Sequence, residues 1–160
     1  MEWPEFEKKL FDQLVTLPER TICIIGLGEQ QRPYVQFAGI HAFPNNNMTI
    51  VCGFEDESPE RRFTPEERAF FVECNFERHD EDPSYWEQEV AWPPSGQALL
   101  KVVRGFLARL RDIEGVASPD ELTYRSWRAA GYGIGRFREM TYPADHDLTL
   151  RRLGLRRIES

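Results

Sequence analysis

The sequence has few of the residues that build disulfide frameworks and metal centres. Its three cysteines, Cys23, Cys52 and Cys74, are an odd number and form no CxxC pair. Small secreted domains use even sets of cysteine, so this set predicts a reduced protein without disulfides. The three histidines stand apart, and there is no HExxH motif. A zinc site needs three or four converging ligands, and we therefore predict no metal and no cofactor.

Long hydrophobic runs and an excess of positive charge are also absent. No apolar stretch approaches the length of about 20 residues that crosses a membrane. The first residues, MEWPEFEKKL, are charged and amphipathic, unlike a signal peptide. The formal charge of −7 argues against nucleic acid as the main partner. These features predict a cytoplasmic protein that binds neither membrane nor nucleic acid.

Motifs of catalysis are missing as well. The serines have no GxSxG context, and the glycines of GYGIG (131–135) follow neither GxGxxG nor GxxxxGK[ST] spacing. We predict that the protein is not an enzyme and has no catalytic residue. A small enzyme with an unrecognised site remains an alternative.

One short window does concentrate residues that bind metals or transfer protons. FVECNFERHDEDPSYWEQEV (71–90) contains Cys74, His79 and a run of acidic side chains. Two ligand types from one loop are too few for zinc, and the acids lack the spacing of a calcium loop. We interpret the window as a helix end, a solvated polar loop and the start of a strand.

The spacing of apolar residues predicts the secondary structure. Three- and four-residue spacing predicts helices over 3–17, 64–74 and 95–114, and Thr64 and Glu67 form a capping box at the second of these. Apolar or alternating runs predict strands over 21–28, 32–40, 48–54, 85–92 and 120–127. The fold class is therefore α+β, with an antiparallel sheet of about five strands and helices packed on one face.

Charge divides the chain into a body, residues 1–127, and an Arg-rich extension, residues 128–160. The body carries −10 and the extension +3. Two alternatives follow: the extension packs on the acidic body, or it waits for an acidic partner. We expect packing, because Leu148, Leu150 and Leu153 need burial.

The aromatic residues favour a protein-binding role. Four Trp and eleven Phe are more than a small core requires, so part of this set suits a partner surface. Gln36 shares a strand face with Tyr34 and lies either on the open face of the sheet, which we expect, or hydrogen-bonded inside the core.

Several phrases also follow one another in a recognisable order. They are the W-x2-F-x3-L-x3-L-x2-LP run from Trp3 to Pro18, YVQF (34–37), the helix start at Phe63 to Glu67, the pairs Asn75-Phe76 and Tyr85-Trp86, and the L-x-Y of Leu122 to Tyr124. Over residues 1–127 this order resembles the TY-Chap domain, a Tir-chaperone-like family of actinobacterial proteins related in fold to type III secretion chaperones and YbjN-like proteins. Asn75 stands near the place of a Gly in that family, and we expect it to adopt the left-handed helix cap.

The resemblance implies a non-enzymatic module that binds and masks another protein, such as a secreted effector or a toxin-like protein. A homodimer is a further possibility, since chaperones of this fold commonly dimerise. An immunity protein whose acidic body neutralises a basic toxin is the alternative within the binding class. The residues expected to contact the partner are Tyr34, Gln36, Trp92, Arg151, Arg152, Arg156 and Arg157.

Overall fold

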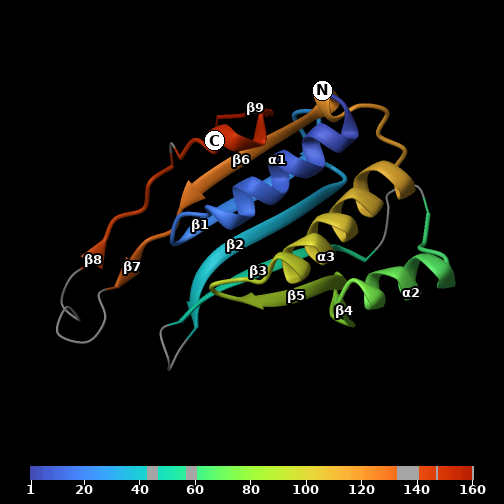
Figure 1. The fold of residues 1–160 in the computed structure, drawn as a ribbon, viewed down its shortest axis with the longest axis horizontal. Coiled ribbons are helices and arrows are strands. Elements are labelled where there is room, and N and C mark those ends of the chain that lie inside the picture. The colour runs from blue at the N-terminus through green and yellow to red at the C-terminus, as the bar shows by residue number, and fades with distance from the viewer. Residues whose placement is uncertain (43–46, 57–60, 133–140, 147, 160) are drawn as a thin grey trace.

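The computed structural model describes residues 1–42, 47–56, 61–132, 141–146 and 148–159. Within these residues, helices form one layer on one face of a sheet, and α1 and α3 lie side by side across it (Figure 1). The helical elements are α1 (Trp3–Val15), α2 (Pro65–Glu73), α3 (Gly96–Leu107), its π-helical continuation η1 (Ala108–Ile113), and the short 3-10 turns η2 (Pro119–Glu121) and η4 (Arg151–Leu153).

The main sheet has seven strands in the order β4-β5-β3-β2-β1-β6-β9. Neighbouring strands are antiparallel except for the last pair, β6 and β9, which is parallel. The strands are β1 (Thr21–Leu27), β2 (Tyr34–Ala42), β3 (Asn47–Glu55), β4 (Glu77–His79), β5 (Tyr85–Ala91), β6 (Leu122–Arg128) and β9 (Arg156–Arg157). A separate ribbon of β7 (Gly131–Tyr132) and β8 (Thr141–Tyr142) extends beyond the end of β6 (Figure 1).

The α+β class is confirmed, but the sheet is larger than the predicted five strands. The additional strands, β4 and β9, contain three and two residues, all of them polar. Strands this short have no alternation of apolar and polar residues, so their sequences carry no strand signal. Both lie at the edges of the sheet, and within the described part of the chain their short length leaves part of the backbone of the neighbouring strands, β5 and β6, without a strand partner.

Local sequence signals set the helix ends. Thr64 and Glu67 form the predicted capping box at the start of α2, and Asn75 ends that helix region with a φ of 67°. Ser95 caps α3 by accepting a hydrogen bond from the Ala98 amide. Gly115, with a φ of 69°, follows η1. Each signal acts within one helical turn, which explains why sequence alone could place it.

An aromatic cluster fills the core where α2 meets the sheet. The rings of Phe54 and Phe71 lie 4.6 Å apart, and those of Phe54 and Phe76 lie 4.9 Å apart. Trp86 joins them and is 2% exposed, so the strand face predicted to meet the core does so. Burying each of these rings contributes about 2–3 kcal/mol to stability.

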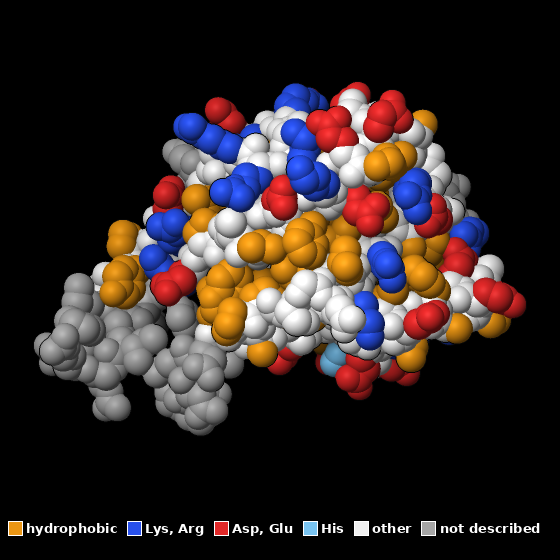
Figure 2. Space-filling model, viewed as in Figure 1, with side chains coloured by type: hydrophobic (Ala, Val, Ile, Leu, Met, Phe, Trp, Pro, Cys, Tyr) orange, Lys and Arg blue, Asp and Glu red, His pale blue; other side chains and the backbone are white. Residues whose placement is uncertain are grey.

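Part of the C-terminal segment lies against the sheet and α1. Leu150 and Leu153 are buried, and η4 contacts α1. The Tyr124 hydroxyl accepts a hydrogen bond of 3.1 Å from the Leu150 amide, and the Ser126 hydroxyl donates to the Leu148 carbonyl. Lys and Arg side chains gather over this region at the upper left of Figure 2. The apolar side chains therefore attach the segment, while Arg151, Arg152 and Arg156 are exposed and Arg157 is half-buried.

Candidate functional site

The face of the sheet opposite α1 and α3 has no described helix packed on it. Tyr34 lies there half-buried, and Gln36 lies there exposed, in agreement with the open-face expectation for this glutamine. Ile40, 42% exposed, extends the same face of β2. This surface is the open face of an antiparallel sheet, and a mixture of polar and aliphatic residues is ordinary there.

The edge of the sheet at β5 has an unpaired segment. β4 pairs only with the first part of β5, from Tyr85 to Glu87, whereas β5 continues to Ala91. In an antiparallel ladder, the N–H and C=O of one residue point to the same side, and those of the next residue point to the other. Along β5, the Trp92 amide donates to Met48 of β3 at 3.0 Å, and the Ser84 carbonyl accepts from Asp56 at 3.1 Å.

Even-numbered residues of β5 therefore bond to β3, and odd-numbered residues point to the outer edge. Tyr85 and Glu87 meet β4 there. Glu89 and Ala91 have no strand partner on that side among the described residues. Two N–H donors and two C=O acceptors consequently line the edge, in the arrangement that receives another strand.

A groove of about 570 Å³ runs beside this unpaired segment. In Figure 1 the segment is the lower edge of β5, between β4 and the start of α3. Its walls come from the end of α2, from β4 and from the first turn of α3. The residues that define it are Asn75, Glu77, Glu89, Val90, Ser95 and Ala98. The groove is lined by Gln88, Glu89, Val90 and Ala91 of β5, so a strand added at this edge would lie in it.

Polar contacts hold the walls of the groove in place. The buried Gln88 amide donates to the Cys74 carbonyl at 3.0 Å, which ties β5 to the end of α2. His79 stacks on Tyr85 with ring centroids 4.8 Å apart, fixing β4 against β5. The Lys101 ammonium lies 3.4 Å from the Asn75 side-chain oxygen and connects α3 to the same wall. The groove is therefore built into the fold before any ligand arrives.

Carboxylates crowd the open-face side of the groove. Glu77, Glu87 and Glu89 all point to this side, and none has an ion-pair partner among the described residues. Burial raises the pKa of Glu87, and the nearby Glu89 and Glu81 raise it further against the opposing effect of His79. A raised carboxyl pKa is the response of a negative charge that is partly withdrawn from water and lies near other negative charges.

The predicted contact residues do not converge on this groove. Trp92 follows β5 directly and is half-buried against the core, whereas Tyr34 and Gln36 lie on β2, two strands inward from β5. The four arginines of the C-terminal segment are at the opposite edge: Arg151 and Arg152 are exposed on η4, Arg156 lies 3.9 Å from Glu29, and Arg157 donates to the His146 carbonyl. Sequence reasoning missed Glu89 and Ala91. The alternation of side chains from Tyr85 to Trp92 predicts that they lie on a strand, but it does not indicate that their backbone groups are unpaired.

The loop with Cys74 and His79 is part of the groove wall. Cys74 is buried, and burial raises the pKa of its thiol. No group of three His, Cys, Asp or Glu residues able to hold a metal occurs in the part of the chain that the structure describes.

Two other features of the sequence concern different parts of the chain. Of the glycines in GYGIG, those at 133 and 135 lie outside the described residues. None of the described helices combines the length and apolar character needed to cross a membrane.

Comparison with known families assigns the chain. A family model described as TY-Chap3, T3SS (YopN, CesT) and YbjN peptide-binding chaperone 3, matches residues 1–128. The chain belongs to this family. The TY-Chap3 match ends at Arg128, the last residue of β6, so β9 and η4 lie beyond it. The comparisons found no match among the curated proteins and none among the solved structures.

Proposed function

We propose that the protein is a non-enzymatic binding module that holds an extended segment of another protein along the free edge of β5. The observation that carries this proposal is the unpaired run at Glu89 and Ala91 beside a groove of about 570 Å³. Membership of a family described as peptide-binding chaperones supports it.

Addition of a strand at this edge uses the backbone of the partner. Glu89 and Ala91 each offer one N–H and one C=O to the incoming segment. Each hydrogen bond contributes about 0.5–1.5 kcal/mol net, and the groove walls reduce competition from water. Backbone pairing tolerates many side chains, which suits a protein that receives segments of different sequence.

The biological consequence is masking. An extended apolar segment that pairs with β5 no longer offers its own backbone to other chains, so its aggregation is suppressed. On this proposal the protein holds a sticky segment of a secreted or toxin-like partner until the partner is delivered.

Amide hydrogen exchange of the full chain tests the proposal directly. In the free protein we expect rapid exchange at the Glu89 and Ala91 amides and slow exchange at Gln88 and Val90, whose amides point to β3. The probe is a set of three blocked octapeptides in which Val alternates with Lys, Ser or Glu. At least one of them should slow exchange at Glu89 and Ala91 and leave Gln88 and Val90 unchanged.

Backbone methylation of the peptide provides a matched control. N-methyl groups on one set of alternate residues should abolish protection, because those N–H groups face β5. Methyl groups on the intervening residues should leave it intact, because those N–H groups face solvent. If no peptide in the set protects either amide, strand addition at this edge is wrong.

A further inference from the structure

The two sides of the groove present opposite chemistry to an added strand. A residue placed opposite Glu89 directs its side chain to the open face, and a residue placed opposite Gln88 or Val90 directs its side chain toward the helices. This holds for parallel and antiparallel addition alike, because paired residues share a face in both. The side-chain types that alternate along the bound segment can therefore be derived without knowing whether the segment runs parallel or antiparallel to β5.

On the open-face side the segment meets negative charge. Glu87 and Glu89 lie two residues apart on β5, about 7 Å along the strand, and Glu77 is paired with Glu87 from β4. The nearby Arg78 is committed elsewhere, since it binds Asp56 at 2.7 Å and Asp80 at 3.2 Å. A Lys or Arg side chain at this position would approach three carboxylates, whereas an acidic side chain would be repelled.

On the helix side the segment meets the apolar side chains of Val90 and Ala98, with the polar Asn75 and Ser95 beside them at the ends of α2 and α3. Val90 is 6% exposed, and Ala98 of α3 is half-buried beside the groove. The polar group closest in sequence, the Gln88 amide, already donates to Cys74. A small or medium apolar side chain fits here, and a charged one would lose its hydration without gaining a partner.

The geometry points to an extended segment in which a basic residue alternates with an apolar residue as the ligand of this groove. This inference rests on the proposed strand addition and names its substrate class. The arrangement excludes acidic segments by repulsion and binds neutral ones weakly. Charge therefore determines which segment is selected, while backbone hydrogen bonds and charge together supply the affinity.

Fluorescence anisotropy with the same three octapeptides and the full chain tests the substrate class. We expect the Lys–Val peptide to bind at least ten-fold more tightly than the Ser–Val peptide at low salt, because each exposed carboxylate contributes about two- to five-fold. The advantage should shrink at 0.5 M salt, where exposed charges are screened. A Lys-Lys-Val-Val block peptide of the same composition should bind more weakly than the alternating one.

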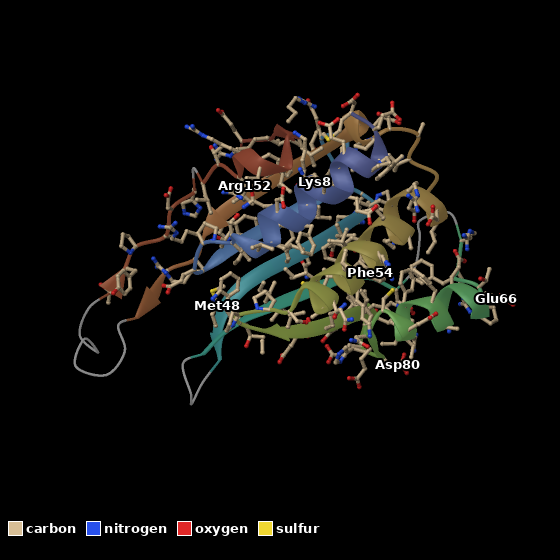
Figure 3. All side chains as sticks on the ribbon, in the orientation of Figure 1. Lys8, Met48, Phe54, Glu66, Asp80 and Arg152 are labelled. Carbon is tan, nitrogen blue, oxygen red and sulfur yellow. The ribbon has the colours of Figure 1, made fainter. Side chains whose placement is uncertain are left out.

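Paired charge variants locate the effect on the protein. Glu87→Gln/Glu89→Gln should remove most of the preference for Lys while leaving Ser–Val binding unchanged. The control, Glu2→Gln/Glu66→Gln, removes the same charge from exposed positions outside the groove and should keep the preference; Figure 3 shows Glu66 at the far end of α2 from β5.

The outcomes separate the two proposals. If Ser–Val or Glu–Val binds as tightly as Lys–Val and protects Glu89 and Ala91 from exchange, strand addition stands and the basic preference is wrong. If the preference for Lys survives in Glu87→Gln/Glu89→Gln, the carboxylates of the groove are not its cause and the inference is overturned. If no peptide binds or protects, both proposals fail together.

Discussion

Asp56 is a single residue that joins three parts of the groove-bearing edge. Its side chain is fully buried and accepts hydrogen bonds from Arg78 of β4, at 2.7 Å, from Ser84, at 3.2 Å, and from the Trp86 indole of β5. Burial alone would raise the pKa of Asp56, but these donors outweigh it and lower the pKa below its usual range. The short β4 strand is therefore held by a side-chain network as much as by its backbone pairs.

Asp56→Asn should destabilise the protein by about 2–4 kcal/mol at pH 7, because it leaves Arg78 and Trp86 without a charged acceptor. A carboxyl whose folded pKa is lowered contributes stability that is present above its unfolded pKa, about 3.9, and is lost as pH falls through the folded pKa. The difference between the unfolding free energies of wild type and variant should thus begin to shrink below about pH 4 and vanish only below the folded pKa. Urea unfolding at pH 7, 5, 4 and 3 measures this.

The matched control is Asp80→Asn, which removes the second carboxylate that binds Arg78. The Asp80 side chain is 86% exposed and points away from the body beside β4 (Figure 3), so its loss should cost less than about 1 kcal/mol. A constant difference between wild type and Asp56→Asn from pH 7 to pH 3 would contradict the role given to the buried carboxylate.

Helix α3 illustrates packing at the scale of an element. Glycine inside a helix costs about 1 kcal/mol relative to alanine, yet Gly105 lies in the last turn of α3, which continues directly into η1. A Cβ at this position would lie 3.1 Å from Cδ2 of the Phe76 ring and closer still to Cε2. Gly105 therefore lets the ring that precedes β4 pack directly on the helix backbone.

Two glycines of α3 give opposite expectations for the same substitution. Gly105→Ala should destabilise the protein by about 1–2 kcal/mol, since overpacking against Phe76 exceeds the gain in helix propensity. Gly96→Ala should be neutral or stabilising by up to about 1 kcal/mol, because no heavy atom lies within 4 Å of the point that the added Cβ would occupy. Thermal unfolding of both variants measures this difference. Equal changes in melting temperature would show that contact with Phe76 does not make the substitution at Gly105 costly.

How far the sequence predicts these elements depends on the range of the signal. The cap at Thr64 and the left-handed Asn75 depend on neighbours within one turn, and the alternation from Tyr85 to Trp92 states which face of β5 is buried. The free edge has no such signal, because it depends on where β4 stops and on the order of strands in the sheet. Arg109 of η1 shows the same limit. Arginine is usually a surface residue, but this one is fully buried beside Glu114 and Phe63.

At the scale of the whole molecule, the C-terminal segment lies at one edge of the sheet and the groove at the other. β9 pairs with Thr123 and Tyr124 of β6, Leu150 before η4 and Leu153 within it are buried, and η4 contacts α1. Arg152, labelled at this segment in Figure 3, is exposed. The leucines should therefore supply the attachment and the arginines little of it.

Deleting residues 143–160 should lower the unfolding free energy by about 3–6 kcal/mol, from two buried leucines at about 1.5–3 kcal/mol each. It should also increase ANS fluorescence, because the surface under η4 becomes exposed. The control is replacement of Arg151, Arg152, Arg156 and Arg157 by Gln in the full chain, which should cost much less. A truncated chain that keeps full stability but no longer binds its peptide would show that the segment is a docking element instead.

The pairing of β9 with β6 also limits how many copies can join through their sheets. In polymer chemistry a monomer with two reactive ends forms chains, whereas a monomer with one reactive end stops growth after a single coupling. Among the described strands, the far edge of the sheet is the two-residue β9, which carries Arg156 and Arg157 and offers little backbone for pairing, so the longer unpaired run of β5 is the more reactive end. On the proposed strand addition, an aggregation-prone segment that couples to the β5 edge is therefore terminated rather than extended.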